Sequence, residues 1–104
     1  MGISPVCLID ENSNVIAKFT DPENSLYESL LPPLEDRSYR CLCYIDPWGD
    51  TVFNPYQMDD LIAELDRILA SRMHEKQRRA LLEIRALAVR CKNEVHTYLK
   101  FIGD

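Results

Sequence analysis

The chain has 104 residues, of which 46% are apolar and 28% charged, and its net charge is −5. These values exclude a disordered chain and are typical of one folded domain with a modest core, so we expect a single domain over residues 1–104. No apolar run approaches the roughly 18 residues of a membrane-spanning helix, and the N-terminus lacks the basic start and apolar core of a signal peptide, so the sequence predicts a cytoplasmic protein without a membrane partner.

Two short apolar runs near the N-terminus predict a β-hairpin. Residues 6–9 and 15–19 flank the turn-forming residues 10–14. A short helical turn is expected next, because apolar side chains stand at helical spacing before a Pro-Pro pair that ends any helix: Leu26, Tyr27, Leu30 and Leu31, then Pro32 and Pro33.

Residues 41–45, Cys-Leu-Cys-Tyr-Ile, are apolar at every position, which predicts a central strand covered on both faces. Residues 51–53 predict a second strand that returns from a turn at 46–50. Pro47 fixes φ in that turn, and Gly49 can supply the positive φ that a type II or similar turn requires.

Asn54 and Pro55 predict the start of a helix, with Asn as the N-cap and Pro at the first helical position. Asp59 and Asp60 follow near the positive end of its dipole. One apolar stripe repeats every three or four residues: Met58, Leu61, Ile62, Leu65, Ile68 and Leu69. After a break at 71–74, a second helix is expected with this buried face: Leu81, Ile84, Ala88, Cys91 and Val95.

The last segment, 96–102, alternates polar and apolar residues and then becomes apolar, which predicts a half-buried strand paired with 41–45. The order of elements indicates an α+β fold. We expect a small, mainly antiparallel sheet of about four to five strands, with a C-terminal helical hairpin on one face and the last strand returning to the sheet.

The four cysteines, Cys7, Cys41, Cys43 and Cys91, are expected to be reduced and buried. The alternative is a zinc site formed with His74 and His96, but the chain has no Cys-x-x-Cys and the histidines lack the usual ligand spacing. No Gly-rich phosphate loop or Ser-centred nucleophile elbow is present. We therefore expect no metal, no cofactor and no catalytic residue.

Charge is distributed unevenly along the chain. Residues 1–66 carry 13 acidic and 3 basic side chains, whereas residues 67–104 carry 4 acidic and 9 basic ones. The acidic part would repel nucleic acid. In an acidic protein, the basic side chains of the second predicted helix are expected to be solvated or to form ion pairs with the acidic part rather than to bind nucleic acid.

The turn Asp46-Pro47-Trp48-Gly49-Asp50 is the main functional candidate. It is either a hairpin corner whose aspartates bond to their own backbone, or a recognition loop, because a tryptophan between two carboxylates has the composition of a binding hot spot. Trp48 could also fold back onto the sheet. The carboxylates do not follow a calcium-loop pattern, and a small turn rarely shifts their pKa values enough for acid–base chemistry.

Two blocks, IDPWGDTVFNPYQM and YLKFIGD, resemble small uncharacterised bacterial proteins that are associated with toxin-immunity loci. The blocks bracket the helical pair and lie within the last three-fifths of the chain. The resemblance implies a compact cytosolic protein without catalytic residues, and Asp46, Pro47, Gly49 and Asp50 are the positions that match the pattern.

These observations favour a non-enzymatic protein-binding module, an immunity- or antitoxin-type inhibitor of a bacterial toxin. The expected partner is a protein such as a basic toxin domain. The expected contact residues are Asp46, Trp48, Gly49, Asp50, Asp59 and Asp60. The alternatives are a small enzyme or metal-binding protein that uses the aspartates near the turn, and a homodimeric structural module joined through the basic helix or a sheet edge.

Overall fold

The computed structural model describes residues 2–21 and 36–103, and the helical turn expected at 26–31 lies outside them. The elements follow in this order: β1 (Ile3–Asp10), β2 (Val15–Phe19), the short 3-10 helix η1 (Leu42–Tyr44), β3 (Asp50–Phe53), the 3-10 helix η2 (Pro55–Gln57), α2 (Met58–Leu69), α3 (Glu75–Asn93) and β4 (Thr97–Gly103). Among these residues, no helix is both long enough and apolar enough to cross a membrane.

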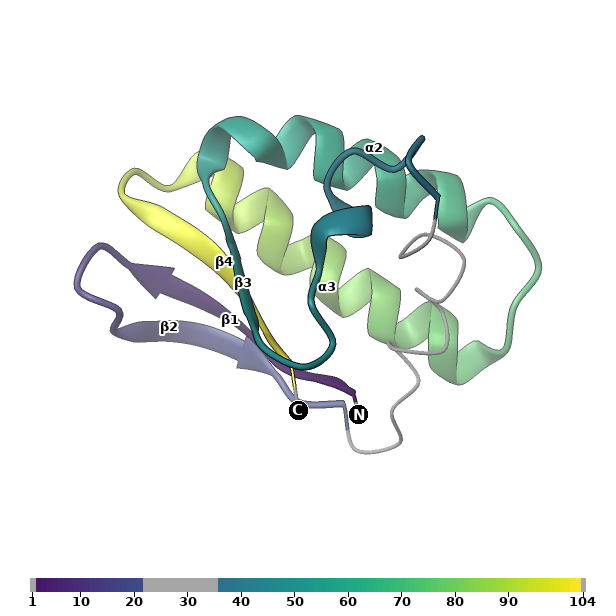
Figure 1. Ribbon diagram of the computed structural model, residues 1–104, viewed down its shortest axis with the longest axis horizontal. Helices are drawn as coiled ribbons and strands as arrows, with labels where there is room; N and C mark the ends of the chain where they lie inside the picture. Colours follow the sequence, from purple (N-terminus) through teal and green to yellow (C-terminus); the bar gives the residue numbers. More distant parts are fainter. Residues whose placement is uncertain (1, 22–35, 104) are drawn as a thin grey trace.

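The strands form a four-stranded sheet in the order β2-β1-β4-β3. All three pairings are antiparallel, and β4 lies between β1 and β3. Helices α2 and α3 run side by side along one face of this sheet, and the two ends of the chain lie close together at one end of it (Figure 1). The predicted α+β fold, with a helical hairpin on one face and a returning last strand, is confirmed.

The core lies between the sheet and the two helices. Leu8 pairs with Leu99 and Leu99 with Phe53, so these three buried side chains form one row on the helical side of the sheet. Phe101 lies in the next row and meets Phe53 edge-on, with ring centroids 5.7 Å apart. The helices contribute buried side chains at three- and four-residue spacing: Met58, Leu61, Leu65, Ile68, Ala80, Leu81, Ile84, Leu87, Ala88 and Cys91.

The predicted N-terminal hairpin and the predicted helix start at Asn54 and Pro55 are both confirmed. Asp10 closes the β1–β2 loop, since its carboxylate accepts hydrogen bonds from the backbone N–H groups of Asn12 and Asn14, each at 2.9 Å. Asn54 caps η2, which continues into α2. Its side chain accepts from the N–H of Gln57 at 3.2 Å, and the Gln57 side chain accepts from the N–H of Asn54 at 2.8 Å.

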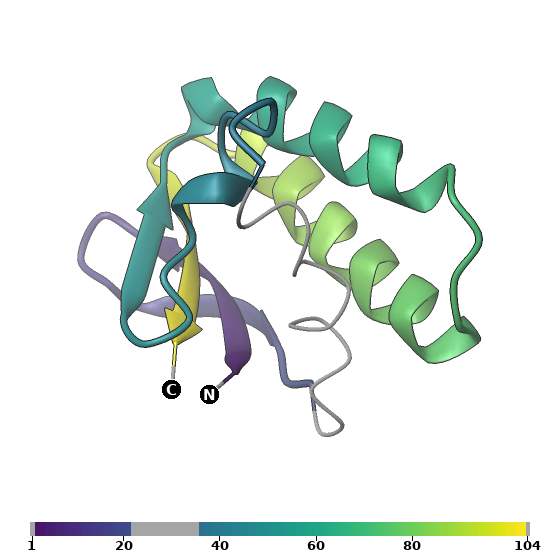
Figure 2. The same ribbon diagram turned by 45° about the vertical axis from the view of Figure 1, so that its right-hand side comes forward.

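The prediction of a strand at 41–45 is wrong. These residues form η1 and irregular backbone beneath α2, as the second view shows (Figure 2). Both edges of β4 are already paired with β1 and β3, so no place beside it remains for 41–45. Cys41, Leu42 and Ile45 are buried nonetheless, because a short apolar run can be covered without being part of a sheet.

Two predictions at the end of α3 are also wrong. Helix α3 ends at Asn93, so Val95 lies beyond the buried helical face and is exposed. His96 lies in the turn before β4 rather than in the strand, with a left-handed φ of 59°. Thr97 closes this turn by donating from its hydroxyl to the carbonyl oxygens of Cys91 and Glu94, at 3.1 and 2.8 Å.

The acidic and basic parts of the chain meet through surface ion pairs. These are Arg85–Asp66 at 2.6 Å, Lys92–Asp59 at 2.7 Å, Lys100–Asp50 at 3.5 Å and Arg67–Asp36 at 3.9 Å. The expectation that basic side chains of the second helix pair with the acidic part is confirmed at Arg85 and Lys92, while Arg67 belongs to α2 and Lys100 to β4. Such exposed pairs add little stability individually, and the two that involve Arg85 and Lys92 reduce the positive potential along α3.

Candidate functional site

The turn at 46–50 leads from η1 into β3 and is held by its own first residue. The Asp46 carboxylate accepts a hydrogen bond from the backbone N–H of Trp48 at 2.9 Å, and its carbonyl accepts from the N–H of Gly49 at 3.3 Å. The backbone N–H of Asp46 donates to the Thr51 hydroxyl at 2.9 Å. The prediction that an aspartate of this turn bonds to its own backbone is therefore confirmed at Asp46.

The turn is also fastened to the C-terminal strand through Gly103. The Gly103 N–H donates to the Gly49 carbonyl at 2.7 Å, and a Cβ atom at Gly103 would overlap the backbone of Asp46 and Gly49. Gly49 does not have the positive φ that we expected. It suits its position for another reason, since a Cβ there would lie 2.9 Å from the Asp46 carboxylate.

Trp48 stands on the surface and is 69% exposed. The sequence left two positions open for the Trp48 side chain, exposed on the loop or folded back onto the sheet. In the structure it is exposed on the loop. Asp46 and Asp50 are exposed on either side of it, and Asp50 pairs with Lys100 of β4 at 3.5 Å. An aromatic side chain between carboxylates, on a backbone fixed by hydrogen bonds, can bind another molecule with little loss of entropy.

The two other predicted contact residues, Asp59 and Asp60, lie at the opposite end of β3, in the first turn of α2 (Figure 1). The structure therefore does not bring them together with Trp48. Asp59 pairs with Lys92 of α3 at 2.7 Å, and Asp60 is exposed.

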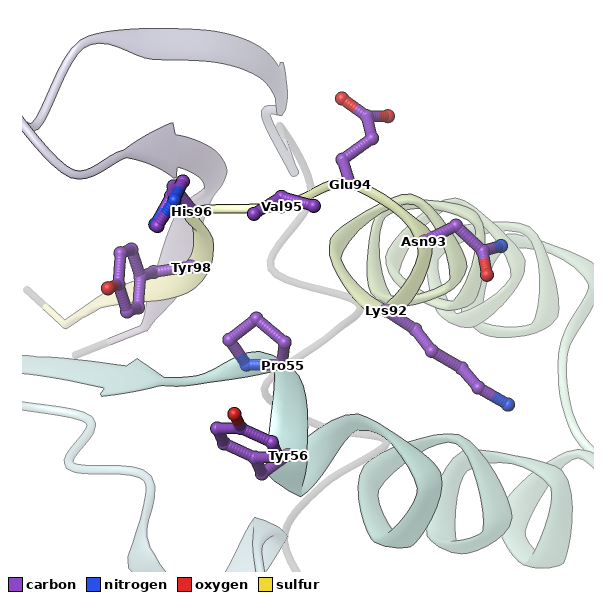
Figure 3. A pocket seen from close by; sticks show the side chains of 8 residues that line it. All are labelled: Pro55, Tyr56, Lys92, Asn93, Glu94, Val95, His96 and Tyr98. Carbon is purple, nitrogen blue, oxygen red and sulfur yellow. The ribbon is translucent and has the colours of Figure 1, made fainter.

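The Lys92 that pairs with Asp59 also lines a pocket of about 310 Å³ that the sequence did not reveal, and we call it the Tyr56 pocket. Its lining comes from the start of η2 and from the segment that joins α3 to β4: Pro55, Tyr56, Lys92, Asn93, Glu94, Val95, His96 and Tyr98. Figure 3 shows Pro55 between the rings of Tyr56 and Tyr98, with Val95 on the opposite rim and Glu94 and Lys92 pointing away.

Sequence reasoning also missed Glu64, which lies on the buried side of α2. Its carboxylate accepts hydrogen bonds from the backbone N–H of Cys41, at 3.1 and 3.0 Å to its two oxygens, and from that of Leu42 at 2.9 Å. It thus satisfies the N-terminal donors of η1 and ties this segment to α2. Burial, with Glu64 and Asp60 nearby, raises the pKa of the Cys41 thiol to about 11.

A second hollow, of about 370 Å³, is basic. Arg37, Arg40, Cys43 and Tyr44 line it, and the Arg37 guanidinium lies over the Tyr44 ring, 5.7 Å from its centroid. A positively charged partner would be repelled at this hollow.

The four cysteines are free, and three of them, Cys7, Cys41 and Cys91, are buried. In the part of the chain that the structure describes, no three His, Cys, Asp or Glu side chains gather in a way that could hold a metal ion. Comparison of the chain with protein-family models, with curated proteins and with solved structures finds no match.

Proposed function

We propose that this protein is a non-enzymatic protein-binding module, an immunity- or antitoxin-type inhibitor that binds a basic bacterial toxin in the cytoplasm. One observation carries the proposal, which is the exposed indole of Trp48 between Asp46 and Asp50 on a turn that hydrogen bonds hold in place. Tryptophan is among the residues that contribute most to protein interfaces, and a fixed backbone lowers the cost of binding.

Electrostatics supports a basic partner. The protein carries a net charge of −5, and several lysines and arginines of its second part already pair with aspartates. A negative surface accelerates association with a basic protein and disfavours nucleic acid. The resemblance of the 45–58 and 98–104 blocks to proteins of toxin-immunity loci points in the same direction.

The proposal is tested by affinity capture from a bacterial lysate with the wild-type protein, Trp48→Ala and the matched control Tyr44→Ala, which removes an exposed aromatic ring elsewhere. We expect wild type and control to capture the same basic protein, and Trp48→Ala to bind it at least about tenfold more weakly. The free energy of unfolding should change by no more than about 0.5 kcal/mol in both variants, because both side chains are exposed.

The captured protein is then expressed in cells with and without this chain. Growth restored by the wild type and not by Trp48→Ala is the expected result. Unchanged capture by Trp48→Ala, together with a large loss of its stability, would contradict the proposal. A stoichiometric metal in the purified protein would favour the metal-binding alternative, and a dimeric mass in light scattering would favour the structural one.

A further inference from the structure

The basic hollow beside η1 contains two arginines whose charges are not neutralised. Arg37 and Arg40 line it together with Cys43 and Tyr44, and its volume of about 370 Å³ lies within the range of about 300–1,000 Å³ of small-molecule sites. Within residues 2–21 and 36–103, neither arginine forms an ion pair, although the protein carries a net charge of −5. Two such positive charges at one hollow indicate a site for an anion.

The backbone before and within η1 places these side chains on one side. Arg37, Arg40 and Cys43 follow one another at a spacing of three residues, which is the repeat of a 3-10 helix. The hydrogen bonds have the same period, because the N–H groups of Tyr39 and Tyr44 each donate to the carbonyl oxygen three residues earlier, both at 3.0 Å. The local winding of the chain therefore brings the two guanidinium groups to one hollow.

Helix α2 fixes this segment from the other side. The Arg67 guanidinium lies over the ring of the buried Tyr39, 4.2 Å from its centroid, and donates to the Ser38 hydroxyl at 2.9 Å. Glu64 of the same helix accepts hydrogen bonds from the backbone N–H groups at the start of η1. The backbone of the hollow is thus held by the fold itself, and an anion that binds there has few further groups to order.

The carboxylates of this region do not neutralise the two arginines. Asp36 accepts a hydrogen bond from the backbone N–H of Ser38 at 2.9 Å and pairs with Arg67 at 3.9 Å. Glu64 is buried and bonded to η1, and Asp60 in the first turn of α2 pairs with neither arginine. The hollow therefore keeps the positive potential of both guanidinium groups.

We propose that the basic hollow binds a phosphate group with two negative charges, as in inorganic phosphate or a phosphate monoester. Two guanidinium groups supply two positive charges and two planar sets of N–H donors. These match a doubly charged group with several oxygens better than a carboxylate or a phosphate diester, each of which carries one charge. The Arg37 guanidinium lies over the Tyr44 ring, 5.7 Å from its centroid, so the contact uses its face and leaves the N–H groups at its edge for the ligand.

The inference goes beyond the proposed function and does not rest on it, because a basic toxin would be repelled at this hollow. The test is an NMR titration of the full chain at constant ionic strength and about pH 8, where a phosphate monoester is doubly charged. The four probes are inorganic phosphate, glycerol 3-phosphate, dimethyl phosphate and acetate. We expect the first two to shift the backbone amide signals of residues 37–44 to saturation, and to bind at least about fivefold more tightly than the singly charged probes.

The first two probes also distinguish the sources of the phosphate group. Tighter binding of glycerol 3-phosphate than of inorganic phosphate would assign the hollow to an esterified ligand. Equal or weaker binding of the ester would assign it to the free ion. Both results are expected of the same site, because the two guanidinium groups contact only the phosphate oxygens.

Variants of the protein locate the effect. Arg37→Gln and Arg40→Gln should each weaken binding of inorganic phosphate about tenfold, because each removes hydrogen bonds between charged groups. The matched control is Arg72→Gln, which removes the charge of an exposed arginine that forms no ion pair in the described part of the chain. The control should bind phosphate as the wild type does, and equal weakening in all three variants would show that only the net charge matters.

Cys43 gives a second measurement that needs no substitution. It lines the hollow and is half-buried, whereas the other three cysteines are buried. Bound phosphate should therefore slow the alkylation of Cys43 by uncharged iodoacetamide, as followed by mass spectrometry. Amide signals at 37–44 that do not move, a diester that binds as tightly as phosphate, or an alkylation rate that phosphate leaves unchanged would overturn the inference.

Discussion

The two ends of β3 present exposed aromatic side chains in different ways. At one end, Trp48 stands on a turn whose backbone is tied to Asp46 and to Gly103. At the other end, Tyr56 lies among further apolar side chains that come from a distant part of the chain. The first is a single projecting side chain, and the second is a hollow.

The difference shows how rigidity is obtained at each end. The turn depends on hydrogen bonds and on the lack of a side chain at Gly103, so small changes at its support should displace Trp48. The pocket depends on the Asn54–Gln57 hydrogen bonds at the start of η2 and on the hydrogen bonds of the Thr97 hydroxyl at the start of β4. Changes that loosen the turn should therefore leave the pocket intact.

The largest effect is expected at Glu64. Glu64→Ala leaves the buried N–H groups of Cys41 and Leu42 without acceptors, which should lower the free energy of unfolding by about 2–4 kcal/mol. Glu64→Gln keeps one carbonyl oxygen and should recover part of this loss. Urea denaturation measures both. In Glu64→Ala, backbone hydrogen exchange should become faster at residues 41–50 and remain unchanged at residues 94–98. If Glu64→Ala is as stable as the wild type, the carboxylate does not hold η1.

Gly103→Ala should have the next largest effect. The added methyl group would overlap the backbone of the 46–49 turn, and we expect a loss of about 1–3 kcal/mol. The matched control is Gly49→Ala, whose methyl group would meet only the movable Asp46 side chain and should cost less. If the two variants are equally stable, the turn is not fastened through Gly103.

A smaller effect is expected from the titration of Cys41, whose thiol is buried beside Glu64. Its folded pKa of about 11 exceeds the ordinary value near 9, so the native state retains the proton that the unfolded chain releases. This contribution to stability is complete below pH 9 and is lost as the pH rises to 11. In denaturation measured across that range, Cys41→Ala should show a weaker decline than the wild type. An identical decline would contradict the raised pKa.

Much of the fold could be predicted because its signals are local. Asn54-Pro55, the apolar stripe of α2 and the alternation at 97–102 each specify one element within a few residues. The run at 41–45 could not be assigned, because periodicity does not distinguish a buried strand from other buried backbone. Glu64 carried a readable signal, since it is an acidic residue within the apolar stripe of α2 and so needed a buried partner.

The candidate site also has one part with a local sequence signal and one part without. Trp48 was visible because the turn carries its own pattern of proline, glycine and aspartate. The Tyr56 pocket was not, because it joins residues 55–56 to residues 92–98 and neither segment has a distinctive composition. Its main cause is the end of α3 at Asn93, two residues before Val95, which places that side chain outside the core.

The most direct test of the central claim is the fluorescence of Trp48, the only tryptophan in the chain, during titration with the captured partner. In the free protein, acrylamide should quench the emission almost as efficiently as it quenches free tryptophan. On saturation with the partner, the emission should shift to shorter wavelength and become protected from quenching. Emission that is already protected in the free protein, or that stays quenchable and unshifted in the saturated complex, would contradict the claim that Trp48 anchors this protein to its target.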